Sequence, residues 1–127
     1  MRKKRILVDM SATIIHHGHI NILEKASKLG DVIIALTTDK EISKKKNYFP
    51  ELNYNSRKKI LSSIKFVKEI IPSKWLITNS FLEKYNIDYL VHGNDNQNDV
   101  DKSKLIIFSR TKKISTTILR RKIKRNV

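Results

Sequence analysis

Residues 6–19 read ILVDMSATIIHHGH and decide how this chain folds. The apolar run at 6–8 predicts a strand, and apolar residues at 20, 23, 26 and 29 predict a helix directly after the histidines. This order of elements places His16 and His19 at a helix N-terminus, where backbone N–H groups and the helix dipole favour anions. Gly18 lets the backbone approach a phosphate closely. The H-x-G-H pattern therefore indicates nucleotide chemistry.

Two other interpretations of these histidines stay open at this point. The motif also fits a loop that carries two satisfied surface histidines. A zinc site is less favoured, because the chain has no Cys and no acidic residue in an H-E-x-x-H pattern.

A second strand-to-helix junction lies near the other end of the chain. The apolar run at 105–108 predicts a strand, and the spacing of Ile118, Leu119 and Ile123 predicts a helix after it. Ser115, Thr116 or Thr117 can cap that helix. Their hydroxyl and N–H groups suit phosphate, and Arg110 adds a bidentate cation. Alone, the junction also fits an ordinary capped terminal helix, but two such junctions in one short chain favour a phosphate site.

Composition sets the class of protein and its partners. The 127 residues carry 27 Lys and Arg against 12 Asp and Glu, a formal net charge of +15 that attracts polyanions. Many of the lysines are equally well explained as solvated surface residues. The absence of Cys excludes disulfides and thiol catalysis. The short apolar run after the basic N-terminus is too short for a signal peptide, so we expect a cytoplasmic protein.

Strand and helix patterns alternate along one domain that spans residues 1–127. The expected strands cover 4–9, 31–37, 67–71, 88–92 and 104–109, and the expected helices cover 18–29, 54–65, 79–85 and 115–124, with Gly30 closing the first helix. Continuous apolar strands suit a doubly wound, parallel, five-stranded Rossmann-like α/β sheet. Ligands bind such sheets beyond the carboxyl ends of the strands. His16, Asp39, Gly93 and Arg110 each follow a predicted strand, so we expect them to converge.

These motifs together resemble the glycerol-3-phosphate cytidylyltransferase type of the H-x-G-H nucleotidyltransferases. The resemblance runs in order through H16-H-G-H, T37-T-D, R57-K-K-I-L, H92-G-N-D and R110-T to I114-S-T-T. The stretch from Val8 to Ala12 is also similar to cytidylyltransferase domains that act on phosphonates. Departures from the family pattern occur at Thr13 (several members carry an acid there), Lys68, Asn94, Asn96 and Lys113.

The resemblance implies a set of site residues. The catalytic residues are His16, His19 and Arg110. The nucleotide-binding residues are Ser11, Ala12, His16, Gly18, His19, Lys46, Gly93, Asp95, Arg110, Thr111, Ile114, Ser115, Thr116 and Thr117. The substrate-binding residues are Asp39, Lys44 and Arg57, and the metal ligands are unknown.

The implied reaction transfers CMP from CTP to a small phosphorylated or phosphonate alcohol, with magnesium accompanying the triphosphate and pyrophosphate leaving. A homodimer is expected. The alternatives are an adenylyltransferase of the same superfamily and a non-catalytic module that binds polyanions or nucleic acid. No specific nucleic acid is expected, because Phe108 is the only aromatic residue after Tyr89. The basic residues Arg120, Arg121, Lys122, Lys124 and Arg125 predict a weak contact with anionic surfaces.

Overall fold

The computed structural model describes residues 2–109 and 114–126. It contains a five-stranded sheet of order β3-β2-β1-β4-β5, and every neighbouring pair is parallel. The strands are β1 (Arg5–Met10), β2 (Asp31–Thr37), β3 (Glu69–Ser73), β4 (Tyr89–His92) and β5 (Leu105–Ile107). The helices are α1 (His17–Ser27), α2 (Asp39–Lys46), α3 (Tyr54–Ser62), α4 (Asn79–Lys84) and α5 (Thr116–Arg125), with a 3-10 turn η1 at Lys102–Lys104.

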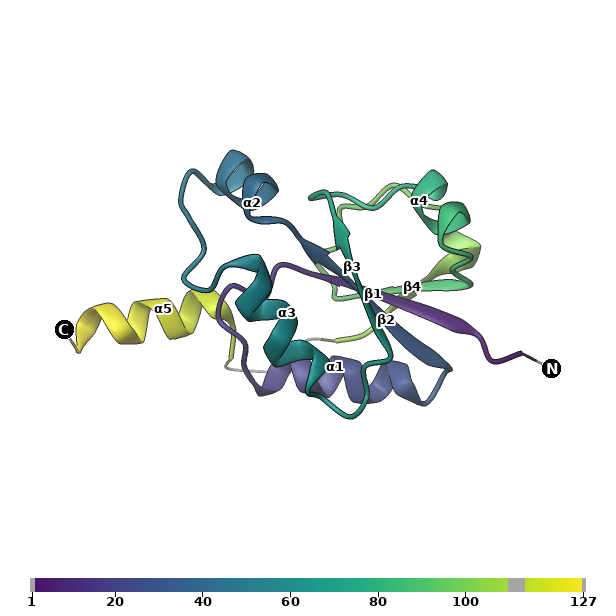
Figure 1. The fold of residues 1–127 in the computed structure, drawn as a ribbon, viewed down its shortest axis with the longest axis horizontal. Coiled ribbons are helices and arrows are strands. Elements are labelled where there is room, and N and C mark those ends of the chain that lie inside the picture. Colours follow the sequence, from purple (N-terminus) through teal and green to yellow (C-terminus); the bar gives the residue numbers. More distant parts are fainter. Residues whose placement is uncertain (1, 110–113, 127) are drawn as a thin grey trace.

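The connections wind in both directions from β1. The chain runs outward through α1, β2, α3 and β3, and then returns through α4 to place β4 on the other side of β1. Figure 1 shows α1 and α3 together on one side of the sheet and α4 on the other. The predicted doubly wound α/β architecture is confirmed, and its strand order reverses between β1 and β4. That point is where such folds bind ligands.

The central strands are apolar on both faces, because helices cover both. Ile6 and Val8 of β1 pack with Leu23 of α1 and Leu61 of α3. The intervening residue, Leu7, packs on the opposite face with Ala35 and with Leu82 of α4. Alternating sides along one strand explain why the sequence shows continuous apolar runs rather than an alternation.

Two local predictions differ from the structure. β3 begins two residues later than expected and extends through Pro72, which an edge strand tolerates because its missing N–H need not pair across the sheet. Gly30 does not cap α1 in a left-handed conformation. A Cβ at this position would lie 2.3 Å from the carbonyl oxygen of Lys4, so a close backbone approach requires glycine.

Asp88 ties the amino ends of β1 and β4 together. Its carboxylate accepts a hydrogen bond from the Arg5 backbone N–H at 2.8 Å and from the Arg2 guanidinium at 2.9 Å. The backbone N–H of Asp88 donates to the Arg5 carbonyl at 2.9 Å. The hydrogen bond from the Arg5 N–H, assisted by Arg2, holds the pKa of Asp88 below its ordinary value.

We expect Asp88→Asn to lower the free energy of unfolding by about 1 kcal/mol at pH 7, because a neutral amide is a weaker acceptor than a carboxylate. A lowered folded-state pKa contributes stability above the unfolded-state pKa of about 4, and this contribution is lost as pH falls through the folded-state value. The difference between variant and wild type should therefore shrink in acid. Urea unfolding at several pH values measures it. Asp99→Asn, at an exposed position, is the control, and a difference that persists at pH 2 would contradict the assignment.

Candidate active site

A cleft of about 680 Å³ opens at the carboxyl edge of the sheet, at the switch point between β1 and β4. Five segments that are distant in sequence form its walls. They are the loop from β1 into α1, the end of α2 with the loop after it, the segment after β3, the loop after β4, and the start of α5. Of the four strand-end residues expected to converge, His16 and Gly93 line the cleft, Asp39 does not, and Arg110 lies outside the described residues.

The two histidines of the H-x-G-H motif form the N-terminal cap of α1. Nδ1 of His16 accepts a hydrogen bond from the Gly18 N–H at 3.0 Å, and Nδ1 of His19 accepts one from the His16 N–H at 3.1 Å. A backbone N–H only donates, so each Nδ1 must be unprotonated, and each neutral ring carries its hydrogen on Nε2. The ring centroids lie 4.0 Å apart, and both residues line the cleft. The cap thus turns both rings into Nε2–H donors.

Gly18 is required by this arrangement for a steric reason. A Cβ there would lie 2.7 Å from Cε1 and 2.9 Å from Nδ1 of the His16 ring, and 3.4 Å from Cγ2 of Ile114. The predicted role was a close approach of the backbone to phosphate. The structure adds that any side chain at this position would displace the ring of His16.

The start of α5 brings a second helix N-terminus to the same cleft. Ser115 is the N-cap, and its hydroxyl accepts a hydrogen bond from the Ile118 N–H at 3.0 Å, which confirms the expected Ser or Thr cap. The Thr116 hydroxyl donates to the carbonyl of Ile14 at 3.0 Å and so joins the start of α5 to the loop before α1. The N–H groups of Ser115, Thr116 and Thr117 have no acceptor within the helix, as at any helix start, and this end of the helix dipole favours anions.

A partly buried polar network lines the cleft where β1 and β4 end. One oxygen of Asp9 is 2.5 Å from Nδ1 of His92, and the other accepts from the Asn98 amide at 3.0 Å. Asn98 also accepts from the Ile77 N–H at 2.6 Å. This network was absent from the sequence prediction, because Asp9 and Asn98 carry no motif and are 89 residues apart.

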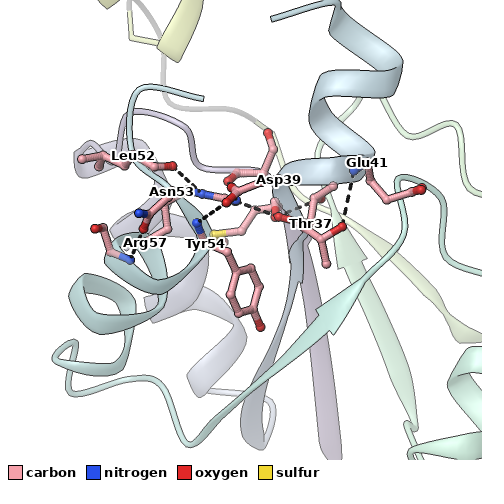
Figure 2. A network of polar contacts seen from close by, with 11 residues as sticks. Thr37, Asp39, Glu41, Leu52, Asn53, Tyr54 and Arg57 are labelled. Carbon is pink, nitrogen blue, oxygen red and sulfur yellow. Dashed lines mark hydrogen bonds and ion pairs between the residues drawn. The ribbon is translucent and has the colours of Figure 1, made fainter. Parts of the chain in front are cut away.

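Arg57 and Asp39, predicted to contact substrate, make contacts with protein groups and lie outside the cleft wall. The Arg57 side chain has no exposure to solvent, and its guanidinium donates to the carbonyls of Leu52, Ser11 and Thr37 at 2.6–2.9 Å. It also donates to Asp39 at 2.7 Å, and Asp39 accepts from the Tyr54 N–H at 3.0 Å (Figure 2). Neither residue lines the cleft. In this structure both side chains bind protein groups, so their predicted contact with substrate stays a prediction.

The ionisable side chains of the cleft wall favour anions. Lys25, Lys45, Lys46 and Arg120 line it, against Asp9 and Asp95. Nζ of Lys46 lies 5.4 Å from the ring centre of Trp75, which also lines the cleft. Lys44, predicted as a substrate contact, is not among the lining residues, whereas its neighbour Lys45 is. Lys45, Trp75 and Arg120 were not predicted.

Most of the predicted nucleotide-binding residues line this cleft, although their roles stay predictions. The lining residues among them are Ser11, Ala12, His16, Gly18, His19, Lys46, Gly93, Asp95, Ile114, Ser115, Thr116 and Thr117. Arg110 and Thr111 lie outside the described residues. Arg121, Lys122, Lys124 and Arg125 are exposed and are not part of the wall, so their predicted contact with anionic surfaces stays a prediction.

A family model described as cytidylyltransferase-like matches residues 11–122. The chain belongs to this family. It is 35% identical over 128 residues to a glycerol-3-phosphate cytidylyltransferase of Staphylococcus aureus, covering 94% of this chain and 95% of the relative. It is 38% identical over 93 residues to the mouse ethanolamine-phosphate cytidylyltransferase, covering 72% of this chain and 23% of that protein. The lipopolysaccharide core biosynthesis protein of Thermoplasma volcanium has the same fold, with a TM-score of 0.72 at 21% identity over 85% of this chain and 98% of its own.

We expect Arg57→Lys to lower the free energy of unfolding by about 2–4 kcal/mol, because a single ammonium cannot reach four acceptors and leaves buried carbonyls unpaired. Thermal or urea unfolding measures the loss. Lys58→Gln, at an exposed position on the same helix, is the matched control. Unchanged stability together with weaker substrate binding would support the predicted role of Arg57 as a substrate contact.

Proposed function

We propose that this protein transfers CMP from CTP to a small phosphorylated or phosphonate alcohol and releases pyrophosphate. One observation carries the proposal. His16 and His19 each hold Nδ1 as an acceptor inside the α1 cap and line a cationic cleft that also receives the start of α5. Two neutral Nε2–H donors beside a second helix N-terminus suit a polyphosphate that gains charge at one phosphorus.

The chemistry needs no protein nucleophile. A phosphate or phosphonate oxygen of the acceptor attacks the α-phosphorus of CTP, the new P–O bond forms, and the bond to pyrophosphate breaks. The Nε2–H groups of His16 and His19 donate to the α-phosphate oxygens as their charge grows. The N-terminus of α5 and Arg110 hold the outgoing phosphates, and Lys45 and Lys46 reduce the repulsion between the two anionic reactants. Positioning and charge stabilisation supply the catalysis.

In this proposal the nucleotide, and not the protein, supplies the ligands of the magnesium ion. Among the residues described there is no group of three or more His, Cys, Asp or Glu side chains that could hold a metal. Both oxygens of Asp9 already contact His92 and Asn98. Phosphate oxygens and water are the ligands that magnesium ordinarily keeps beside a nucleotide. We therefore propose that the ion enters as the counter-ion of CTP.

The base and the acceptor are tested together. Phosphate-binding groups do not select a base, so an adenylyltransferase is the second candidate, and kinship with the named cytidylyltransferases favours CTP. We expect pyrophosphate release with CTP and not with ATP, in a screen of glycerol 3-phosphate, phosphoethanolamine, phosphocholine, a sugar phosphate and an aminoalkylphosphonate.

CTP at a hundredfold excess over its Kd should also stabilise the fold by about 2.7 kcal/mol. Equal thermal shifts with ATP and CTP would refute the base assignment.

We expect His16→Asn and His19→Asn to reduce kcat about a hundredfold while changing the Kd of CTP far less, because the lost donors act on charge that develops in the transition state. Asparagine keeps an acceptor near the position of Nδ1, so the cap of α1 is retained. His17→Ala, at an exposed position outside the cleft wall, is the control. Turnover near the wild-type rate in both variants would make the histidines structural.

We also propose that the protein is a homodimer, since symmetric dimers are the commonest soluble oligomers. Sedimentation velocity at micromolar concentration, with and without CTP, tests this. A monomer mass under both conditions would contradict it.

A further inference from the structure

Helix α5 carries part of the proposed phosphate site but has few attachments to the rest of the protein. None of its ten residues, all of which are described, is buried, and Ile123 is 55% exposed. Figure 1 shows α5 extending away from the sheet. At its start the Thr116 hydroxyl holds the Ile14 carbonyl. That one hydrogen bond fixes a point, so a second attachment is needed to fix the direction of the helix.

Arg120 supplies the second attachment, one turn further along α5. Nε and Nη2 of its guanidinium donate to the two carboxylate oxygens of Glu51 at 2.7 and 2.8 Å. Nη2 also donates to the Thr13 hydroxyl at 3.1 Å and to the Tyr48 hydroxyl at 3.2 Å. The guanidinium carbon lies 4.8 Å from the centre of the Tyr48 ring. The bidentate contact with a carboxylate, together with the contact to an aromatic ring, suits an arginine and not a lysine.

The partners of Arg120 belong to two other walls of the cleft. Tyr48 and Glu51 lie in the loop after α2, which follows directly on Lys45 and Lys46. Thr13 lies in the loop between β1 and α1. Since Lys45, Lys46, Tyr48, Thr13 and Arg120 all line the cleft, the contacts of Arg120 join three of its walls.

We propose that Arg120 is a positioning residue, and that its contacts with Glu51, Tyr48 and Thr13 form a latch that holds the N-terminus of α5 in place for phosphate binding. The consequence for nucleotide binding rests on the proposed function, whereas the mechanical role of the latch does not.

Direct binding of phosphate by Arg120 is the competing explanation. Replacing Glu51 distinguishes direct binding from the latch. The Glu51 side chain is 41% exposed and does not line the cleft. The hydrogen bond from Arg120 holds the pKa of Glu51 below its ordinary value, so the carboxylate is charged at neutral pH. Removing that negative charge should strengthen phosphate binding if Arg120 acts directly. Removal should weaken it if the latch orients α5.

The experiment compares Arg120→Gln, Glu51→Gln and the double variant with wild type. Hydrogen exchange of the α5 backbone amides is measured without nucleotide, and the Kd of CTP and of inorganic triphosphate is measured by calorimetry. We expect each single variant to weaken both ligands about five- to tenfold and to speed amide exchange in α5, and the double variant to add little more. Arg121→Gln, the adjacent exposed residue, should change neither quantity.

A charge exchange provides the rescue. In Glu51→Arg combined with Arg120→Glu, the ion pair is reversed, and the Tyr48 and Thr13 hydroxyls can donate to the new carboxylate. We expect slow amide exchange in α5 to return. Glu51→Gln with unchanged or tighter triphosphate binding, or unchanged exchange in both single variants, would overturn the latch. Absence of turnover with every acceptor in wild type would instead count against the proposed function and leave the exchange result standing.

Discussion

A guanidinium without exposure to solvent must find protein acceptors for its hydrogens, and Arg57 finds them at the carboxyl ends of two strands. The Ser11 carbonyl follows β1, the Thr37 carbonyl ends β2, and the Leu52 carbonyl belongs to the loop before α3. Asp39, at the start of α2, accepts from the same group. One side chain thereby joins the loop after β1 to the loop before α3, and residues of both loops line the cleft. Few other groups could do so, because a planar cation with five donors reaches several acceptors in fixed directions.

The backbone next to the Arg57 contacts is strained, as expected where surrounding contacts determine the conformation. Ala12 has a φ of 48°, a left-handed conformation that costs a non-glycine residue on the order of 1 kcal/mol or more. Such a conformation persists only where surrounding contacts determine it, and the neighbouring Ser11 carbonyl is held at 2.6 Å by Arg57. The loop then leads into the α1 cap, where the two histidines fix each other through the backbone. The two histidine rings thus follow directly along the chain from a loop that Arg57 holds, although Arg57 itself does not line the cleft.

Polar contacts, rather than apolar packing, set the geometry above the sheet edge. The core clusters consist mainly of strand residues and the inner faces of α1, α3 and α4, with a few loop residues, and no α5 residue belongs to them. Asn98 ties the segment after β3 to the end of β1, and Arg120 ties α5 to two loops. Directional hydrogen bonds suit this purpose because they specify position, whereas apolar burial mainly specifies which faces meet.

The sequence by itself determined the sheet, the two strand-to-helix junctions and the family. Apolar runs at the strands, the H-x-G-H motif and the Ser-Thr-Thr cap are local patterns, and parallel topology brings their ends to one edge. Only the tertiary structure decided that the Arg57 side chain is buried against protein acceptors while Lys45, Trp75 and Arg120 line the cleft. The physical reason is that the partners of a charged side chain are chosen by space and not by sequence distance. Arg57 meets a carbonyl 46 residues away, and Arg120 meets a carboxylate 69 residues away, so no local pattern distinguishes a structural cation from one that can reach a ligand.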